Sequence, residues 1–480
     1  MGRERGIRGG VVLLFAVIVH GGCGGGRSVD ESEPDGGRPA QQVLGSVVTG
    51  TRLLKGKLDV FGITTDDFAA VLDSNGGALA VPISGGPAQP IDPTADMAAV
   101  TGPVIYSFHG VDPTSTFGEL TIWTAANGAI PFASGATWPV AVSDDGTRVL
   151  ATAATASDGT QTNLVLGGTD GASPTTLFAV GLGLGCQPSM QFAGGRFVVS
   201  ACPPGSSEAT ISSIDPADGT TITLLTEAQN QVTVIPFAQI VALIDRDGTA
   251  YAADVAGSHP QVIGQSVTQI VCSPDGSALF LASQGTVSVV PLNGGAAGAL
   301  PPANVISLWE ASPDGQSLLF QPKAGVVGPL SGGGLWVTST TSGGPARQLS
   351  SENDAFTSPD TPFTADSQWA LWFADPGPYG AGRLMAGAVS GGPTSVLGRR
   401  AVTVAAAGGA RVLFTDTYTM APGHVGRAVL RAADLSTGDP PTVMATEVGP
   451  SFYLTHAHHQ VVFSFDDGTD QAGIYLAPLH

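Results

Sequence analysis

One short pattern recurs along most of this chain and constrains its fold more than any other feature. It is clearest around Ser273, in "CSPDGSALFLAS", where a polar Ser-Pro-Asp-Gly turn precedes an apolar run. Asp and Gly favour a tight turn, because Asp bonds its own backbone and Gly accepts a positive φ. The run from Ala278 to Ala282 is apolar at every position, which is typical of a strand buried on both faces. Altered copies are "SDDGTRVLATA" from Ser143, "AGGRFVVSA" from Ala193, "SPDGQSLLFQ" from Ser312, "TADSQWALWFA" from Thr364 and "AGGARVLFT" from Ala407.

A second pattern recurs with the same period as the first. A Gly-Gly pair stands between two apolar runs in the segments that begin at Ser84, Asn293, Ser342 and Ser390. Such a pair predicts a hairpin turn. The combined unit is four antiparallel strands in about 40 residues, which is the content of a propeller blade. From Leu58 to His480 we count about ten such units, and the sequence predicts about eight to ten blades.

Composition agrees with an all-β fold. The 480 residues include 67 Gly and 35 Pro, and only 12% are charged. No segment after residue 20 has sustained helical periodicity, and no run of apolar residues is long enough to span a bilayer. We therefore expect one β-propeller domain over residues 45–480, since a propeller grows by repetition. A net charge of −20 argues against a nucleic-acid partner, because it repels phosphate backbones, and we expect none.

The first 22 residues have the organisation of an export signal. Three arginines precede the apolar stretch Val11–Val19, and small residues lead to Cys23. Cys23 directly after two glycines resembles a bacterial lipobox, although His20 stands where Leu is usual. The resemblance implies that Cys23 is lipidated and becomes the mature N-terminus. The alternative is an ordinary signal peptide followed by an incidental cysteine.

Residues 23–44 are of low complexity and acidic, which predicts a flexible tether. Its root-mean-square length of roughly 25 Å would hold the domain close to the membrane. Gly24 rather than Asp after Cys23 predicts sorting to the outer membrane. The expected location is thus the bacterial cell envelope, facing the periplasm or the cell surface.

Three cysteines remain for an oxidising compartment. Cys186 and Cys202 flank the inner strands of one unit, each beside turn residues, so we expect a disulfide between them. Cys272 precedes the Ser-Pro-Asp-Gly turn, where other copies carry Val142 or Ala311. We expect it to be a buried thiol that packs as a small apolar side chain.

The sequence contains no recognisable catalytic or cofactor motif. It has no Gly-x-Ser-x-Gly elbow, Walker loop, dinucleotide fingerprint or His-Glu-x-x-His motif. One segment contains His456, His458 and His459, and alternation along a strand would put His456 and His458 on one face, a spacing that a metal could use. The segment aligns with the turns of the other units, however. The Asp-Gly segments at Asp245 and Asp466 resemble fragments of calcium loops without the full ligand series. We therefore expect no catalytic, cofactor or metal site.

The repeat resembles the WD40-like, PD40-type propellers of TolB and related exported bacterial proteins. The matching residues are the Ser-Pro-Asp-Gly turns at Ser273 and Ser312, their degenerate copies and the downstream Gly-Gly turns. TolB has a further α/β domain and about six blades, so this chain departs from it. The resemblance implies a propeller that binds proteins or peptides across a rim or at the central funnel.

Two classes of function follow. The first is a lipid-anchored scaffold or protein-binding module of the cell envelope, acting as a monomer. The alternative is a propeller enzyme that acts on polysaccharide or peptide at the central funnel. An enzyme would need carboxylates or histidines that converge at the funnel mouth, and the sequence does not show which loops meet.

The sequence also predicts how the ring closes. The last unit has three strands, near Phe452–Thr455, Gln460–Phe465 and Gly473–Pro478, and lacks a fourth. Thr51–Leu54 precedes the first unit and resembles the fourth strands of other units. We therefore expect Thr51–Leu54 to pair with Gly473–Pro478, which leaves no open sheet edge.

Overall fold

A computed structural model describes most of the chain after residue 47. The described residues are 48, 50–74, 76–111, 118–154, 162–181, 188–235, 239–257, 260–274, 276–292, 298–300, 305–322, 334–340, 346–351, 362–375, 377, 381–419, 426–456 and 459–479. The predicted signal and tether, Cys23 and Cys186 lie outside them. Every regular element in these residues is a β-strand. No helix among them has the length and apolar character needed to cross a membrane.

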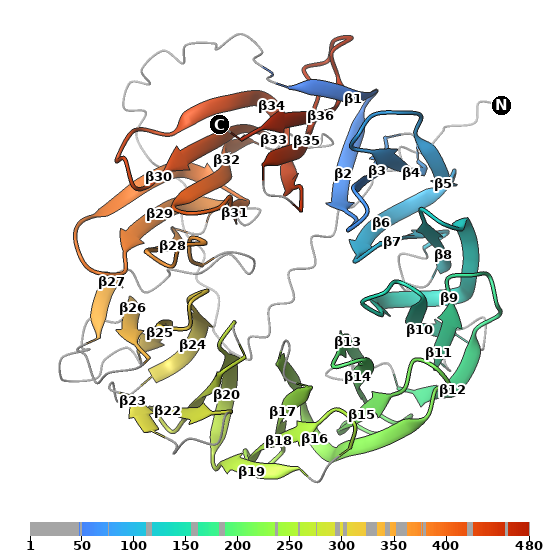
Figure 1. The fold of residues 1–480 in the computed structure, drawn as a ribbon, viewed down its shortest axis with the longest axis vertical. Coiled ribbons are helices and arrows are strands. Elements are labelled where there is room, and N and C mark those ends of the chain that lie inside the picture. Colours follow the sequence, from blue (N-terminus) through green and yellow to red (C-terminus); the bar gives the residue numbers. More distant parts are fainter. Residues whose placement is uncertain are drawn as a thin grey trace, which may run out of the picture.

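The strands form ten successive antiparallel units. Three sheets of seven strands hold two units each, and three sheets of four strands and one of three hold one each. Three long strands, β9, β16 and β34, are shared, because each half of such a strand pairs within a different unit. Figure 1 shows the units following one another in chain order around a common centre.

Units 1 to 5 span the first half of the chain. Unit 1 contains β2 (Leu58–Ile63), β3 (Phe68–Asp73), β4 (Ala78–Pro82) and β5 (Gln89–Asp92). Unit 2 contains β6 (Ala95–Thr101), β7 (Val104–His109), β8 (Gly118–Thr124) and the start of β9 (Gly128–Val142). Unit 3 contains the end of β9, β10 (Arg148–Ala154), β11 (Thr162–Gly168) and β12 (Thr175–Val180). Unit 4 contains β13 (Ser189–Ala193), β14 (Arg196–Ala201), β15 (Ala209–Ile214) and the start of β16 (Thr221–Ile235). Unit 5 contains the end of β16, β17 (Ile240–Asp245), β18 (Ala250–Asp254) and β19 (Gln261–Gly264).

Units 6 to 10 span the second half. Unit 6 contains β20 (Val267–Cys272), β21 (Ala278–Ser283), β22 (Thr286–Pro291) and β23 (Gly298–Leu300). Unit 7 contains β24 (Val305–Ala311), β25 (Ser317–Pro322), β26 (Leu335–Ser339) and β27 (Arg347–Ser350). Unit 8 contains β28 (Trp369–Ala374), β29 (Gly382–Ala388) and β30 (Thr394–Ala401), with Phe363 bridged to Ala370. Unit 9 contains β31 (Val404–Ala406), β32 (Arg411–Thr419), β33 (Arg427–Asp434) and the start of β34 (Thr442–Leu454). Unit 10 contains the end of β34, β35 (Gln460–Phe465), β36 (Gly473–Pro478) and β1 (Thr51–Lys55).

The second strand of each unit is buried on both faces, as its continuous apolar run predicts. In β25, Leu318 and Phe320 pack with unit 6, including Phe280. Leu319, between them, points the other way and packs with Trp372 of unit 8. Because successive side chains of a strand point to opposite faces, a strand between two neighbouring units needs apolar residues at every position.

Each pair of neighbouring units shares one buried apolar cluster. Ten clusters occur in the described residues, and each joins two successive units. One of them joins the last unit to the first: Val60 and Val71 of unit 1 pack with Val462 and Ile474 of unit 10. Units 1 and 10 are therefore in contact.

The Ser-x-Asp-Gly segments and their altered copy at Thr364 form the predicted turns, and the side chains of their first residues stabilise them. At Ser143, Ser312 and Thr364 the hydroxyl donates to the aspartate two residues further on, at 2.6 Å in each case. The same hydroxyl accepts the backbone N–H five residues on, at 2.9–3.1 Å. Ser273 accepts the N–H of Ala278 in the same way, at 3.0 Å. These buried hydroxyls therefore position the start of each second strand.

The pairing between the ends of the chain is also confirmed. β1 runs antiparallel to β36, with Thr51 opposite Leu476 and Lys55 opposite Gly473 (Figure 1). Leu53 and Leu54 are half-buried against the cluster shared by units 1 and 10. The first strand of the chain thus completes the sheet of its last unit.

Candidate binding site

An open hollow of about 800 Å³ lies between units 8 and 9. β30 of unit 8 lies beside β32 of unit 9, and these strands with β29 and β33 form its walls. The side chains and backbone that line it are those of Arg383, Val396, Leu397, Gly398, Arg399, Asp416, Thr417 and Arg431. Three of these eight residues are arginines, which is unusual in a chain with 19 basic and 39 acidic residues.

Asp416 joins the two units across the floor of the hollow. Its Oδ1 accepts the backbone N–H groups of Arg399 at 2.8 Å and Arg400 at 3.2 Å. The glycine at position 398 eases this approach, because a Cβ there would lie only 3.1 Å from both Asp416 Oδ1 and the ring of Phe414. The carboxylate of Asp416 is buried, so these bonds replace its lost hydration.

Arg431 is held by Asp416 but has donors left over. Its Nε lies 3.1 Å from Asp416 Oδ2, an ion pair without the angle of a hydrogen bond. The two terminal nitrogens of Arg431 have no hydrogen-bond partner among the described residues. A guanidinium has five N–H donors, and this one is 23% exposed at the hollow. It can therefore bind an anion without losing its present partner.

The other two arginines complete a positive surface. Arg399 is exposed, and its guanidinium makes no hydrogen bond or ion pair with the rest of the described chain. Arg383 contacts Asp375 at 2.8 Å through one terminal nitrogen. With three arginines and one aspartate lining it, the hollow is positively charged in a protein whose net charge is −20.

The backbone of β32 is distorted where it lines the hollow. Thr417 has a φ of 54°, and the pairing of β32 with β33 shifts register between Asp416 and Thr419. A positive φ is costly for a β-branched residue, and such residues cluster at functional sites. Bulges are likewise frequent beside binding sites, where they redirect side chains.

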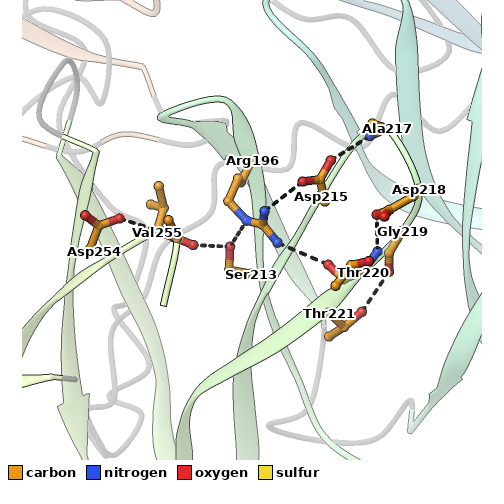
Figure 2. A network of polar contacts seen from close by, with 11 residues as sticks. Arg196, Ser213, Asp215, Ala217, Asp218, Gly219, Thr220, Thr221, Asp254 and Val255 are labelled. Carbon is orange, nitrogen blue, oxygen red and sulfur yellow. Dashed lines mark hydrogen bonds and ion pairs between the residues drawn. The ribbon is translucent and has the colours of Figure 1, made fainter. Parts of the chain in front are cut away.

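A larger polar network, in unit 4, has a structural role. Arg196 donates to Ser213 at 2.8 Å, to Asp215 at 2.9 Å and to the carbonyl of Thr220 at 3.1 Å (Figure 2). Ser213 in turn donates to the carbonyl of Val255 in unit 5. The donors of Arg196 point into the protein, so the network holds two units together and leaves little for a ligand.

A His-Asp pair that joins Asp92 of unit 1 to His109 of unit 2 is the nearest approach to catalytic chemistry. His109 Nδ1 lies 2.8 Å from Asp92 Oδ2, and Thr94 donates to Asp92 Oδ1 from its N–H and its hydroxyl. Burial would raise the pKa of Asp92, but the bonds from Thr94 and His109 outweigh it and lower the pKa. Ser107, on the same face of β7, is fully buried and cannot reach a substrate. The pair therefore lacks an accessible nucleophile.

The histidine and Asp-Gly segments form turns, as their alignment with the repeat predicts. Thr455 donates its N–H to the carbonyl of Gln460 around the histidine turn, where His456 and His459 are exposed. His458 lies outside the described residues. Asp245 Oδ1 accepts two backbone N–H groups of its own turn, at 2.8 and 3.0 Å. No group of His, Cys, Asp and Glu able to hold a metal occurs in the described chain.

The cysteine predictions are tested only in part. Cys202 is disulfide-bonded, whereas Cys186 lies outside the described residues, so their pairing remains a prediction. Cys272 is a thiol that bonds the carbonyl of Ser273 at 3.1 Å. It is half-buried rather than buried as expected, because it ends its strand beside the turn.

We expect a non-reduced digest to link Cys186 to Cys202. Ser189 pairs with Ser200, and the cysteines lie just beyond this pair, so a bridge would extend the hairpin of β13 and β14. Mass spectrometry identifies the linked peptides. A bridge from Cys202 to Cys23 would contradict both this pairing and the lipidation of Cys23.

Sequence reasoning missed the arginine-lined hollow. Its residues come from four strands of two units, and no local motif joins them. One signal was present: six of the 19 basic residues fall between Arg383 and Arg431. Clustered positive charge in an acidic chain indicates a binding surface.

Comparisons with known proteins bear on the fold alone. No known protein family matches the sequence, and no similar sequence was found among curated proteins. Among solved structures, the tricorn protease is 14% identical with a TM-score of 0.32, over 88% of this chain and 52% of its own. This chain thus spans about half the length of that protein.

The β-propeller domain of the Trilobed protease from Pyrococcus furiosus is 11% identical with a TM-score of 0.36, over 73% of this chain and 94% of its own. A putative TolB from Agrobacterium tumefaciens is 12% identical with a TM-score of 0.27, over 64% of this chain and 94% of its own. Propeller proteins are therefore among its structural neighbours, and similarity this low carries no argument about function.

Proposed function

We propose that this chain is a lipid-anchored binding module of the bacterial cell envelope. The observation that carries the binding role is the open hollow between units 8 and 9, lined by three arginines in an acidic protein. A concave site with a few placed polar groups is typical of ligand recognition. The partner is a protein or peptide, and the module works as a monomer.

We also propose that the ten units form one closed propeller. Two independent observations support this architecture: the pairing of β1 with β36, and the apolar cluster shared by the first and last units. Closure would leave no pair of open edges for aggregation between blades. It would also fix the hollow as one of ten inter-blade positions.

The anchoring proposal rests on the residues before the described chain. A basic segment, an apolar stretch and Cys23 after two glycines have the order of a lipoprotein signal. Val48 bridges Ala445, in the half of β34 that belongs to unit 9, and β1 then completes the sheet of unit 10. The proposed tether would therefore attach the membrane anchor where the chain passes from unit 9 to unit 10.

The enzyme alternative has less support. Acid–base chemistry in the described residues centres on the His109–Asp92 pair, and the hydroxyl of Ser107 beside it is buried. The hollow contains arginines and one aspartate already bonded to two N–H groups. This set suits binding of an anion better than proton transfer.

Replacing Cys23 by alanine tests the anchor. We expect the wild-type protein, expressed in a bacterial host, in the membrane fraction, because one thioether-linked lipid group supplies the anchor. The Cys23→Ala protein should be released into the soluble fraction or remain unprocessed. Cell fractionation and the mass of the mature N-terminus measure this. A wild-type protein that is soluble and cleaved elsewhere would show that the signal is an ordinary one.

A further inference from the structure

We infer that the hollow between units 8 and 9 binds the carboxylates of an extended acidic peptide. This inference rests on the proposed binding role and names the ligand class of that site. Its basis is the set of three guanidinium groups on one hollow, together with the strand edge and apolar wall that accompany them. Each of these features selects a different property of the ligand.

The arginines select carboxylates. The two terminal nitrogens of Arg431 and the whole guanidinium of Arg399 make no hydrogen bond or ion pair with the described chain. A planar guanidinium matches a carboxylate with two parallel N–H donors, and such pairs are stronger than neutral hydrogen bonds. Because the rest of the protein is acidic, an anion would be attracted here and repelled elsewhere.

The backbone of β30 already binds one carboxylate of the protein itself. In its sheet β30 pairs with β29 alone, so its other edge has no strand partner among the described residues. Near the end of β30 the N–H groups of Arg399 and Arg400 donate to Asp416. Four consecutive residues, 396–399, line the hollow. An extended peptide can lie along such an edge, where main-chain bonds give affinity and side chains give specificity.

The apolar wall favours a peptide over an acidic sugar. Val396 is 50% exposed, one of few large apolar side chains so exposed in the described chain, and Leu397 lies beside it. The walls carry no aromatic ring, and sugars are commonly bound by stacking on aromatic faces. A volume of about 800 Å³ has room for a short segment with aliphatic and acidic side chains in alternation.

The test is a titration of the full-length protein in a non-ionic detergent with a defined peptide. The probe is acetyl-Val-Glu-Val-Glu-Val-amide, and its partner carries Gln in place of both Glu. We expect calorimetry to show binding of the Glu peptide that weakens as salt is added, and at least about tenfold weaker binding of the Gln peptide. Equal binding of the two peptides would overturn the inference.

Two neighbouring arginines provide the matched variants. Arg399→Gln removes a guanidinium that lines the hollow, whereas Arg400→Gln removes one that does not. Both side chains are exposed, so both variants should keep the thermal unfolding of the wild type. We expect Arg399→Gln to weaken the Glu peptide by about tenfold and Arg400→Gln by less than about twofold. An equal loss in both variants would mean diffuse attraction of charge, and would overturn the inference.

A third titration separates this inference from the proposed function. If hexagalacturonate binds in a manner that depends on Arg399 and the Glu peptide does not, the hollow is a binding site and the peptide class is wrong. If inorganic phosphate alone binds, the site selects a simple anion, which also overturns the inference. If none of the three probes binds, the hollow is not a binding site, and the proposed binding role loses its support. The membrane location, measured on Cys23, is independent of each result.

Discussion

Deleting residues 51–55 should destabilise the whole protein and not only its N-terminal end. The deletion removes β1, whose residues pair with β36 from Thr51 to Lys55. It also removes Leu53 and Leu54 from the apolar cluster that joins units 1 and 10. Losing two half-buried leucines and the main-chain bonds of one strand should cost about 5 kcal/mol. That is comparable to the net stability of a typical domain, about 5–15 kcal/mol.

Thermal unfolding with and without the deletion measures this effect. We expect a fall in Tm of about 10 °C or more and increased aggregation, since an unpaired edge of β36 would be exposed. A deletion of residues 26–40 is the control, because it shortens the predicted tether and leaves β1 intact. If the two deletions have the same Tm, β1 contributes nothing to closure and the single-ring proposal is wrong.

The fold was predictable because its turns and buried strands are local signals. The run from Ala278 to Ala282 lies in a strand with neighbours on both faces, and in the turn before it Gly276 donates its N–H to the carbonyl of Ser273. The fourth strand of unit 10 was also predictable. The segment from Thr51 has the pattern of a fourth strand and no partner near it in sequence, and it pairs with β36.

The shared strands were not predictable from turn residues. β16 runs through Thr221–Ile235 without Gly or Pro, and its two halves belong to different units. Turn residues at the end of each expected strand do not indicate where one long strand belongs to two units of the same sheet. The hollow was missed for a related reason: Arg383, Arg399 and Arg431 are brought together by the packing of two units, which no local pattern encodes.

The seam between units 1 and 10 also contains charges that should make stability depend on pH. Asp59 of β2 lies near Arg427 and Asp466, and Arg427 donates to Asp466. Burial raises the pKa of Asp59 above its ordinary 3.8; the charge of Arg427 and a bond from Ser464 lower it, and Asp466 raises it. Gly449 of β34 leaves room for the side chain of Ser464, because a Cβ at position 449 would collide with its hydroxyl.

The sign of the pH effect follows from the raised pKa. Below pH 3.8 Asp59 is protonated in both the folded and the unfolded protein, so its ionisation does not change the free energy of unfolding there. As the pH rises through the folded pKa, the folded protein must ionise a buried carboxyl that the unfolded chain ionises more easily. Stability is therefore lost with rising pH, and Asp59→Asn should stabilise the protein at pH 7 and not at pH 3.

Replacing Arg427 by methionine should have the larger effect. The change keeps the aliphatic stem and removes the cation from two partly buried aspartates, Asp59 and Asp466, which should cost about 3 kcal/mol at pH 7. The loss should shrink toward pH 4, because protonation of Asp59 relieves the unpaired charge. Denaturant unfolding at both pH values measures it. If the two residues are coupled, Asp59→Asn should stabilise the Arg427→Met protein at pH 7 by more than it stabilises the wild type. A double variant whose loss equals the sum of the single effects would show that Asp59 and Arg427 act independently, and that the seam is held by its apolar cluster alone.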